Sequence, residues 1–380
     1  MNVKQIYTIV NAVSGEVLGK TDIVKDDLTG IVDLGTEVFN QGAVDNYVKS
    51  LVNHIGKVVF VNRPYSGKVP SVLMDAWEFG SVMEKISADI PAAEENDTWN
   101  LTDGAEYKQD VFHKPVVTAK FFNSKVTFEV PVSITERQVK ESFSSAEQLN
   151  GFLSMIYNAV DKSMTIKTDA LIMRTINNMV GETLKADAAK FTPSSKTLDY
   201  ASASTVRCVN LLYLYNQANG TQLTAAQAVL NPDFIRYASY QMGLYADRLQ
   251  SISALFNIGG KDRFTPKDAL HVVLLSDFAK AAQTYLYSDT YNKGEVLLPN
   301  AETVASWQGS GQDYGFAHTS AINIKTASGT DVNISGVLGV MFDRDALGVC
   351  NTDKRVTTNY NAKAEFFNNW YKFDASYFND

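Results

Sequence analysis

The residue types that most often bind metals or attack substrates are sparse in this chain. Its four histidines are His54, His113, His271 and His318. None has a second His, Cys or carboxylate at the spacing that a helix-borne metal site needs. Cys208 and Cys350 lie far apart without a CxxC pattern. This argues for a reducing compartment and against a disulfide framework or a cysteine-built zinc site. We therefore expect no metal and no cofactor.

Two glycine-rich segments are candidates for phosphate binding, and neither has the required pattern. A phosphate-binding loop ending in Gly260-Lys261 needs a glycine five residues before Gly260, where Leu255 stands. Residues 309–315 lack the strand-to-helix context of a dinucleotide site. No G-x-S-x-G elbow is present, and no pair of carboxylates stands in an apolar context. The sequence predicts a protein without a catalytic site.

Composition narrows the class of protein further. The chain has 380 residues, 45% of them hydrophobic and 20% charged, which is typical of a globular protein with a sizeable core. Its net charge of −8, without any run of Lys and Arg, argues against a nucleic-acid groove. The longest strongly apolar stretch, Val337 to Phe342, is too short to cross a membrane. The N-terminus lacks the apolar core of a secretion signal.

Residues 145–180 carry the strongest helical signal. Ser145 and Gln148 match a capping box, and apolar residues then recur with a period near 3.6. Ile156 lies on this apolar stripe, and Gly181 is the predicted stop. A helix of some 35 residues is roughly 50 Å long, so it must lie along a large domain or pair with another helix.

Residues 79–133 predict a long hairpin with an acidic tip. One strand is expected over 82–90 and the returning strand over 116–132, where apolar and polar residues alternate. Between Glu84 and Asp110 eight acids and two lysines give a formal charge of −6. Because an isolated two-stranded hairpin is only marginally stable in water, another surface must cover it. That surface belongs either to its own domain or to a neighbouring molecule.

The remaining segments complete an α+β protein. Residues 1–41 predict an extended polar arm with a short strand near Ile6 to Val10. Residues 43–55 predict a helix and 58–61 a strand. In 205–349 helices alternate with apolar strands, as in an α/β domain, and residues 354–373 predict extended chain. The expected elements of 205–349 are helices at 205–218, 234–249 and 276–287 and strands at 270–275, 322–325 and 336–342.

This order of elements resembles the Hong Kong 97-type capsid fold. The segments Tyr47-Val-Lys-Ser-Leu-Val-Asn-His-Ile-Gly-Lys-Val-Val59 and Phe152-Leu-Ser-Met-Ile-Tyr-Asn-Ala-Val160 resemble those of phi-29-type podophage capsid proteins. The ending, with Phe342-Asp-Arg-Asp345 and then 355–371, is also similar to that group. The resemblance covers nearly the whole chain. Because the chain stops at Asp380, we expect no added immunoglobulin-like domain. Because no helical, charged segment precedes the arm, we expect no fused scaffold.

The resemblance implies a division of the chain and a function. It makes 1–56 the N-terminal arm and first helix, 57–78 with 134–190 the P domain and its spine helix, 79–133 the E-loop, 191–350 the A domain, and 351–380 the returning P-domain strands. It implies a virion protein, assembled in the host cytoplasm as hexamers and pentamers into an icosahedral shell around double-stranded DNA. The implied partners are further copies, a portal protein, a separate scaffolding protein and weakly bound DNA, with no membrane.

The resemblance also gives the acidic hairpin a hypothetical role. In the family this loop lies over the P domain of the adjacent subunit. We therefore expect an intersubunit contact between acidic and basic groups, namely Glu94, Glu95 and Asp97 with Lys162, Lys167, Arg174 and Arg355. Lys354 is a further nearby cation. The alternative is a solvated loop whose charge only aids solubility.

Three other functions remain open at this point. Within the same fold, an encapsulin-type bacterial nanocompartment shell is an alternative. A cytosolic enzyme with an unrecognised site is a second, although no catalytic constellation supports it. A DNA-binding protein is the third, and the net charge of −8 argues against it, because affinity for DNA depends on neutralising phosphates.

Overall fold

The computed structural model describes residues 3–20, 24–25, 30–40, 43–44, 46–51, 69–74, 83–91, 93, 95, 99–107, 110, 112–188, 207–254, 262–287, 301–307, 321–325, 329 and 331–380. The chain forms two compact units. Unit 1 comprises residues 1–78, 124–174 and 349–377, and unit 2 comprises 79–123, 175–348 and 378–380. Both combine helices and strands, in agreement with the predicted α+β class.

Unit 1 is built on a four-stranded sheet of order β1-β10-β11-β4. These strands are β1 (Leu73–Met74), β10 (Leu347–Asn361), β11 (Phe366–Asn379) and β4 (Lys125–Thr135). β11 runs antiparallel to β4, with Tyr371 opposite Val130 and Phe373 opposite Phe128. Burial alternates along β4, as its sequence predicts, so one face of the sheet is apolar and the other polar.

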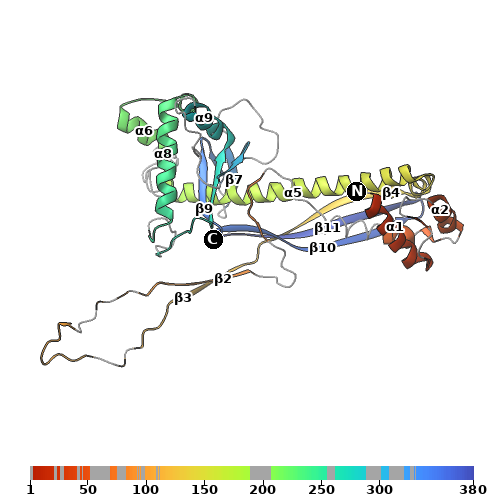
Figure 1. The fold of residues 1–380 in the computed structure, drawn as a ribbon, viewed down its shortest axis with the longest axis horizontal. Helices are drawn as coiled ribbons and strands as arrows, with labels where there is room; N and C mark the ends of the chain where they lie inside the picture. The colour runs from red at the N-terminus through yellow and green to blue at the C-terminus, as the bar shows by residue number, and fades with distance from the viewer. Residues whose placement is uncertain are drawn as a thin grey trace. The chain divides into compact units, whose positions relative to one another are not determined.

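The apolar face of this sheet packs against the long helix α5 (Ala146–Ala188, Figure 1). Its 43 residues correspond to about 65 Å. The predicted N-terminus is confirmed, because the Gln148 amide donates to Ser145 Oγ at 3.2 Å. Ile156 is 1% exposed and shares one hydrophobic core with Ile134 and Phe367. The predicted packed stripe is therefore confirmed.

The predicted end of this helix at Gly181 is wrong. α5 continues through Gly181 to Ala188. A side chain at 181 would collide with Ile324 of strand β7 (Ile322–Lys325). The glycine therefore permits a close approach between helix and strand, and it does not mark a stop.

The N-terminal segment differs from the predicted extended arm. Residues 3–18 form helix α1 (Val3–Leu18), and residues 31–40 form helix α2 (Ile31–Asn40). Ile6, Val10 and Val13 are fully buried in the core of unit 1, so the predicted strand near Ile6 to Val10 is wrong. Their spacing of three and four residues is helical. Residues 46–51 are helical as predicted, whereas the strand predicted at 58–61 lies outside the described residues.

Unit 2 contains a three-stranded sheet of order β6-β5-β9. Central β5 (Leu270–Leu275) pairs in parallel with β6 (Ala301–Val304) and antiparallel with β9 (Gly339–Asp343). Helices α6, α8 and α9 share a core with β5. The unit also has helix α7 and a small hairpin of β7 with β8. The bounds are α6 (Leu211–Asn219), α7 (Ala225–Ala228), α8 (Pro232–Leu249), α9 (Ser276–Tyr287) and β8 (Asp331–Ile334).

Several predictions within 205–349 are confirmed. Asn231 caps α8, because its side chain accepts hydrogen bonds from the amides of Asp233 and Phe234, and Pro232 opens the helix. The strand predicted at 270–275 and the helix at 276–287 are present with the expected bounds.

Two extended segments are interrupted where the sequence predicted continuity. Residues 116–132 divide at Asn123-Ser124 into β3 (Val117–Phe122), which pairs with β2 (Met83–Ala88), and β4, which joins the sheet of unit 1. Helix α4 (Glu136–Ser142) follows β4, with Thr135 and Gln138 as its capping box. Residues 354–373 likewise divide into β10 and β11 at a turn where Glu365 has a φ of 49°.

Candidate functional site

The β2–β3 hairpin has two chemically different faces. Alternate cross-strand pairs of an antiparallel ribbon point to opposite sides. One face carries the pairs Lys85–Lys120 and Ser87–Thr118, and the other carries Glu84–Phe121, Ile86–Ala119 and Ala88–Val117. The first face also carries Phe122, opposite Met83, and is otherwise polar. The second is mainly apolar.

The apolar face of the hairpin is open to solvent. Ile86 and Phe121 are each 65% exposed, and Val117 is 57% exposed. Ile90 extends this surface beyond the strands and is also exposed. Contiguous exposed apolar surface of this kind marks an interaction site more often than a solvated face.

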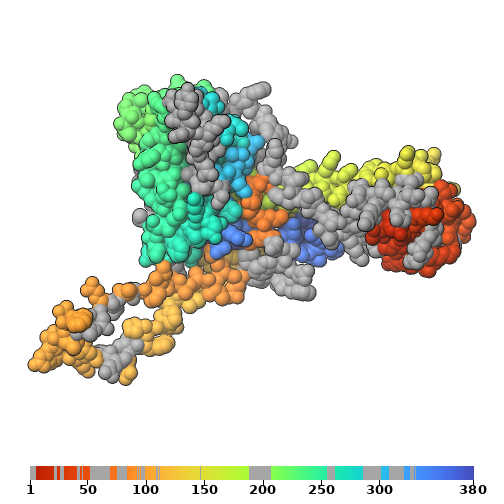
Figure 2. Space-filling model, in the orientation of Figure 1, coloured from red at the N-terminus to blue at the C-terminus, as the bar shows by residue number. Residues whose placement is uncertain are grey.

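The loop that joins β2 to β3 exposes large aromatic side chains. Trp99 is 94% exposed and Phe112 is 85% exposed. Figure 2 shows the described residues of this segment, in orange, as a thin loop with open space between its two sides. Among the described residues of the loop, the Thr102 amide donates to the Tyr107 hydroxyl at 2.9 Å. Trp is the residue type most enriched among the energetic centres of protein interfaces.

The predicted acidic residues lie in this same loop. Glu95 is exposed, whereas Glu94 and Asp97 lie outside the described residues. Asp103, Glu106 and Asp110 are also exposed. The loop therefore combines exposed carboxylates with exposed aromatic rings.

Three of the predicted cations lie on α5 in unit 1. Lys162, Lys167 and Arg174 are exposed, and the Arg174 guanidinium lies 5.3 Å from the ring centroid of Tyr377. Met155 and Ile166 of the same helix are 55% and 65% exposed. Since residues 155, 162 and 166 are separated by seven and four positions, they share one helix face. This face of α5 is both apolar and basic.

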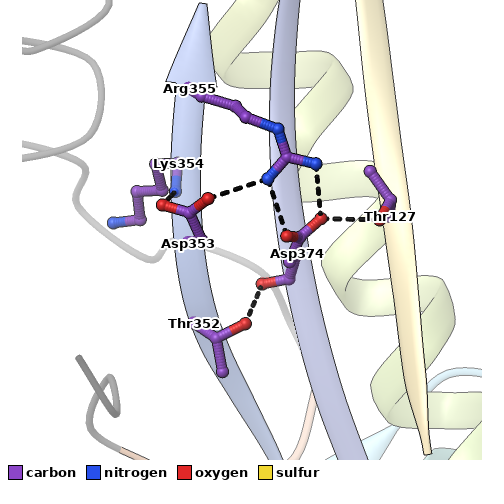
Figure 3. A network of polar contacts seen from close by, with 6 residues as sticks. All are labelled: Thr127, Thr352, Asp353, Lys354, Arg355 and Asp374. Atoms are coloured by element: carbon purple, nitrogen blue, oxygen red, sulfur yellow. Dashed lines mark hydrogen bonds and ion pairs between the residues drawn. The ribbon is translucent and has the colours of Figure 1, made fainter. Parts of the chain in front are cut away.

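The fourth predicted cation, Arg355, is engaged within its own subunit (Figure 3). Its Nη1 lies 2.7 Å from Asp374 Oδ2 and 2.8 Å from Asp353 Oδ2, and its Nη2 lies 3.3 Å from Asp374 Oδ1. Thr127 Oγ1 donates to Asp374 Oδ1 at 2.6 Å, which extends the network from β10 across β11 to β4. The Arg355 hydrogen bond lowers the pKa of Asp374, and the Thr127 hydrogen bond adds to this against the opposing effect of burial.

The described residues offer no alternative chemical site. Within the described ranges no group of three or more His, Cys, Asp or Glu could hold a metal ion. His271 lies half-buried in β5 and stacks on Phe342 with ring centroids 5.4 Å apart, as expected of a structural histidine. His113 is exposed, whereas His54, His318 and both glycine-rich segments lie outside the described residues. No helix among the described residues is long and apolar enough to cross a membrane.

The predicted intersubunit residues divide between the two units. Glu95 belongs to unit 2, and Lys162, Lys167, Arg174 and Arg355 belong to unit 1. The sequence interpretation stressed the charge of the loop and missed its apolar residues. In the sequence, Trp99, Leu101 and Phe112 are large apolar residues inside an acidic segment that is predicted to be a loop. That mismatch was the available signal.

Comparison with known proteins gives one whole-chain match. A sequence model of the family described as Phi29-like phage major capsid protein matches residues 6–379. No curated protein matches the chain.

Solved structures with a similar fold include three phage capsids. The capsid structure of Staphylococcus phage Andhra is 10% identical over 82% of this chain and 80% of that one, with a TM-score of 0.47. That of cyanophage P-SCSP1u is 11% identical over 84% and 88%, with a TM-score of 0.41. The capsid of Ralstonia phage GP4 is 11% identical over 81% and 83%, with a TM-score of 0.39.

Proposed function

Since the chain belongs to the Phi29-like phage major capsid protein family, it forms an icosahedral phage shell, and we propose that the β2–β3 hairpin joins its subunits into hexamers and pentamers. In this proposal the hairpin is the E-loop of a Hong Kong 97-type subunit, and α5 is its spine helix. The shell encloses double-stranded DNA, which it contacts weakly because the net charge of −8 disfavours phosphate binding. A portal protein and a separate scaffolding protein are further proposed partners, with assembly in the host cytoplasm.

The exposed apolar surface of the hairpin carries this proposal. A two-stranded ribbon alone is only marginally stable, and here Ile86, Val117 and Phe121 are all more than half exposed. In a protein that functions as many copies, a second copy is the natural cover for such a face. Trp99 and Phe112 supply anchors of the type that dominates binding energy in protein interfaces.

The exposed face of α5 on a second copy fits this loop in chemistry. It presents Met155 and Ile166 beside Lys162, with Lys167 about 100° further round the helix, so it offers apolar contact together with positive charge. Arg174 lies further along the helix, and Arg355 is already paired with Asp374, so the two lysines carry most of the proposed charge contact. Exposed ion pairs are individually worth only about 0–1 kcal/mol. The charges therefore set the direction of approach more than they set affinity.

No observation favours the encapsulin alternative, and the matching family is one of phage capsid proteins. The enzyme alternative has no support either, because that family is a structural one.

The test replaces the two aromatic anchors together, Trp99→Ala with Phe112→Ala. Truncating a central side chain of an interface typically costs about 2 kcal/mol or more of binding free energy at each subunit contact. Shell formation should therefore fail at concentrations where the wild type assembles. The matched control is Asn100→Ala with His113→Ala, which alters exposed polar neighbours in the same loop. Sedimentation and electron microscopy measure particles, and circular dichroism measures subunit folding. Normal shells from the aromatic double variant would contradict the proposal.

A further inference from the structure

The polar face of the hairpin contains an arrangement that is unfavourable in isolation. Lys85 of β2 stands directly opposite Lys120 of β3. Side chains directly opposite in antiparallel strands start about 5 Å apart, and like charges at such positions destabilise the pairing. The ribbon therefore needs a counter-charge at this point.

Asp380 supplies that counter-charge with one carboxylate oxygen for each lysine. Lys85 Nζ pairs with Asp380 Oδ2, and Lys120 Nζ donates to Asp380 Oδ1 at 2.6 Å. Burial by itself raises the pKa of Asp380, but the hydrogen bonds from Lys120 and Lys85 outweigh it and lower the pKa overall. The carboxylate is thus held in its charged form at neutral pH.

The same contacts join the hairpin to the rest of unit 2. Lys85 Nζ also donates to the Asp345 carbonyl at 3.0 Å, and the Asp380 amide donates to the Ala346 carbonyl at 2.8 Å. The Phe122 ring lies 5.2 Å from that of Phe378, two residues before Asp380. The base of the ribbon is therefore attached to the segment around 345–346 by two lysines, one carboxylate and one aromatic pair.

We infer that Asp380 is a positioning residue that holds the polar face of the β2–β3 ribbon inward and leaves its apolar face free for a second copy. The docking part of this inference rests on the proposed function, whereas the attachment of the ribbon does not. Without the carboxylate, the two lysines repel each other, while the aromatic contact and the Lys85 bond to the Asp345 carbonyl are kept. The ribbon should then loosen without unfolding the unit.

Partial burial makes the contact stronger than an ordinary surface pair. The side chains of Asp380 and Lys85 are only 12% and 21% exposed, so solvent and salt screen their attraction less. Lys120 is 59% exposed and contributes less attraction, although its charge still repels Lys85 when the carboxylate is removed. This asymmetry predicts that removal of Lys120 rescues the loss of Asp380.

The experiment measures amide hydrogen exchange in unassembled subunits of four variants. Asp380→Asn should raise exchange in β2 and β3 by about fivefold or more, because local opening becomes easier, and leave β5 and β9 unchanged. Lys120→Gln alone should change little, and the double variant should recover part of the protection. Asp345→Asn is the matched control, since it removes an exposed carboxylate from the same region and keeps the backbone carbonyl to which Lys85 donates. Electron microscopy of Asp380→Asn assemblies should show misformed particles.

The outcomes separate this inference from the proposed function. Unchanged exchange in Asp380→Asn, or equal exchange in the single and double variants, overturns the positioning role whatever particles form. Raised exchange that Lys120→Gln rescues supports it, even if Trp99→Ala with Phe112→Ala still builds normal shells. Normal shells from that aromatic double variant would overturn only the docking role of the hairpin.

Discussion

Two antiparallel ribbons of this protein, β4–β11 and β2–β3, differ in how their polar and apolar faces are stabilised. The polar face of β4–β11 places complementary groups opposite each other. These pairs are Glu129 with Lys372 at 3.3 Å, Thr127 with Asp374 at 2.6 Å and Ser133 with Asn368 at 2.6 Å. Its apolar face is buried against α5. Both faces of this ribbon therefore find their partners within the same subunit.

The β2–β3 ribbon lacks both features, complementary polar pairs across its strands and a buried apolar face. Its polar face places Lys85 opposite Lys120 and needs Asp380, and its apolar face is exposed. The contrast teaches that one ribbon serves the stability of the subunit, whereas the other is left with the exposed face that we propose for contacts between subunits. Substitutions should therefore have opposite effects on folding and on assembly in the two ribbons.

The largest effect is expected where β4–β11 meets α5. Ile156→Asp places a charge in the core, and an unpaired buried charge costs several kcal/mol, so unit 1 should fail to fold. Met155→Asp is the matched control, because the neighbouring side chain is 55% exposed. Thermal melting followed by circular dichroism compares the two. A soluble Ile156→Asp protein with a wild-type melting curve would show that this face is assigned wrongly.

A matched pair of phenylalanines tests the contrast directly. Phe373→Ala in β11 removes a ring that is 1% exposed, which should cost about 3–5 kcal/mol of unfolding free energy. Phe121→Ala in β3 removes a ring that is 65% exposed, which should change unfolding free energy by less than about 0.5 kcal/mol yet weaken assembly. Denaturant unfolding and light scattering measure the two quantities. Equal losses of stability would erase the distinction between the ribbons.

A smaller effect concerns the charge network of β4–β11 in acid. The pKa of Asp374 is lowered in the folded state, chiefly by the Arg355 hydrogen bond. Its stabilisation is therefore fully present above the ordinary carboxyl pKa of about 3.9 and is lost as the pH falls below that value through the lowered pKa of the folded state. Asp374→Asn should reduce stability at neutral pH and flatten its decline between about pH 5 and 3. Denaturant midpoints across this range measure the slope. Asp353→Asn, at a 65% exposed side chain, should have the weaker effect.

The smallest effect is expected at the acidic loop. Replacing Glu94, Glu95 and Asp97 with Gln, Gln and Asn should slow assembly and reduce its dependence on salt while the subunit stays folded. Exposed charges act mainly through steering, which weakens when the Debye length falls to about 8 Å or less. Light scattering against salt concentration measures both. A variant with the wild-type rate and salt dependence would leave the loop charge with a role in solubility alone.

The sequence predicted elements whose signals are local. The cap at Asn231, the apolar run of β5 and the stripe through Ile156 each lie within one segment, and each is confirmed. The errors arose where the meaning of a sequence pattern depends on residues distant in sequence that pack against it. Gly181 is a residue type that often ends a helix. Here the position requires glycine because Ile324, more than a hundred positions away in sequence, packs against it. Likewise, residues 116–132 alternate throughout, and only their different partner strands show the division at Asn123-Ser124.

In the candidate site, too, local features could be predicted and contacts between distant residues could not. The negative charge of the loop could be counted in the sequence, and so could the cations of α5. The meeting of Lys85, Lys120 and Asp380 could not be predicted, because it depends on the register of β2 with β3 and on the course of the chain after β11. Arg355 also could not be recognised as paired, since Asp374 lies on the next strand.

The order of strands in unit 1 has a consequence for synthesis. β11 lies between β10 and β4 in the sheet, yet it comes last in the chain. At a synthesis rate of about 5–20 residues per second, β4 waits roughly 10–50 s for the strand that pairs with it. The apolar face of α5, which is made after β4, lacks the cover of β11 for a somewhat shorter interval. We therefore expect ribosome-bound chains to depend on chaperones, and the subunit to become competent for its neighbours only after β11 has been made.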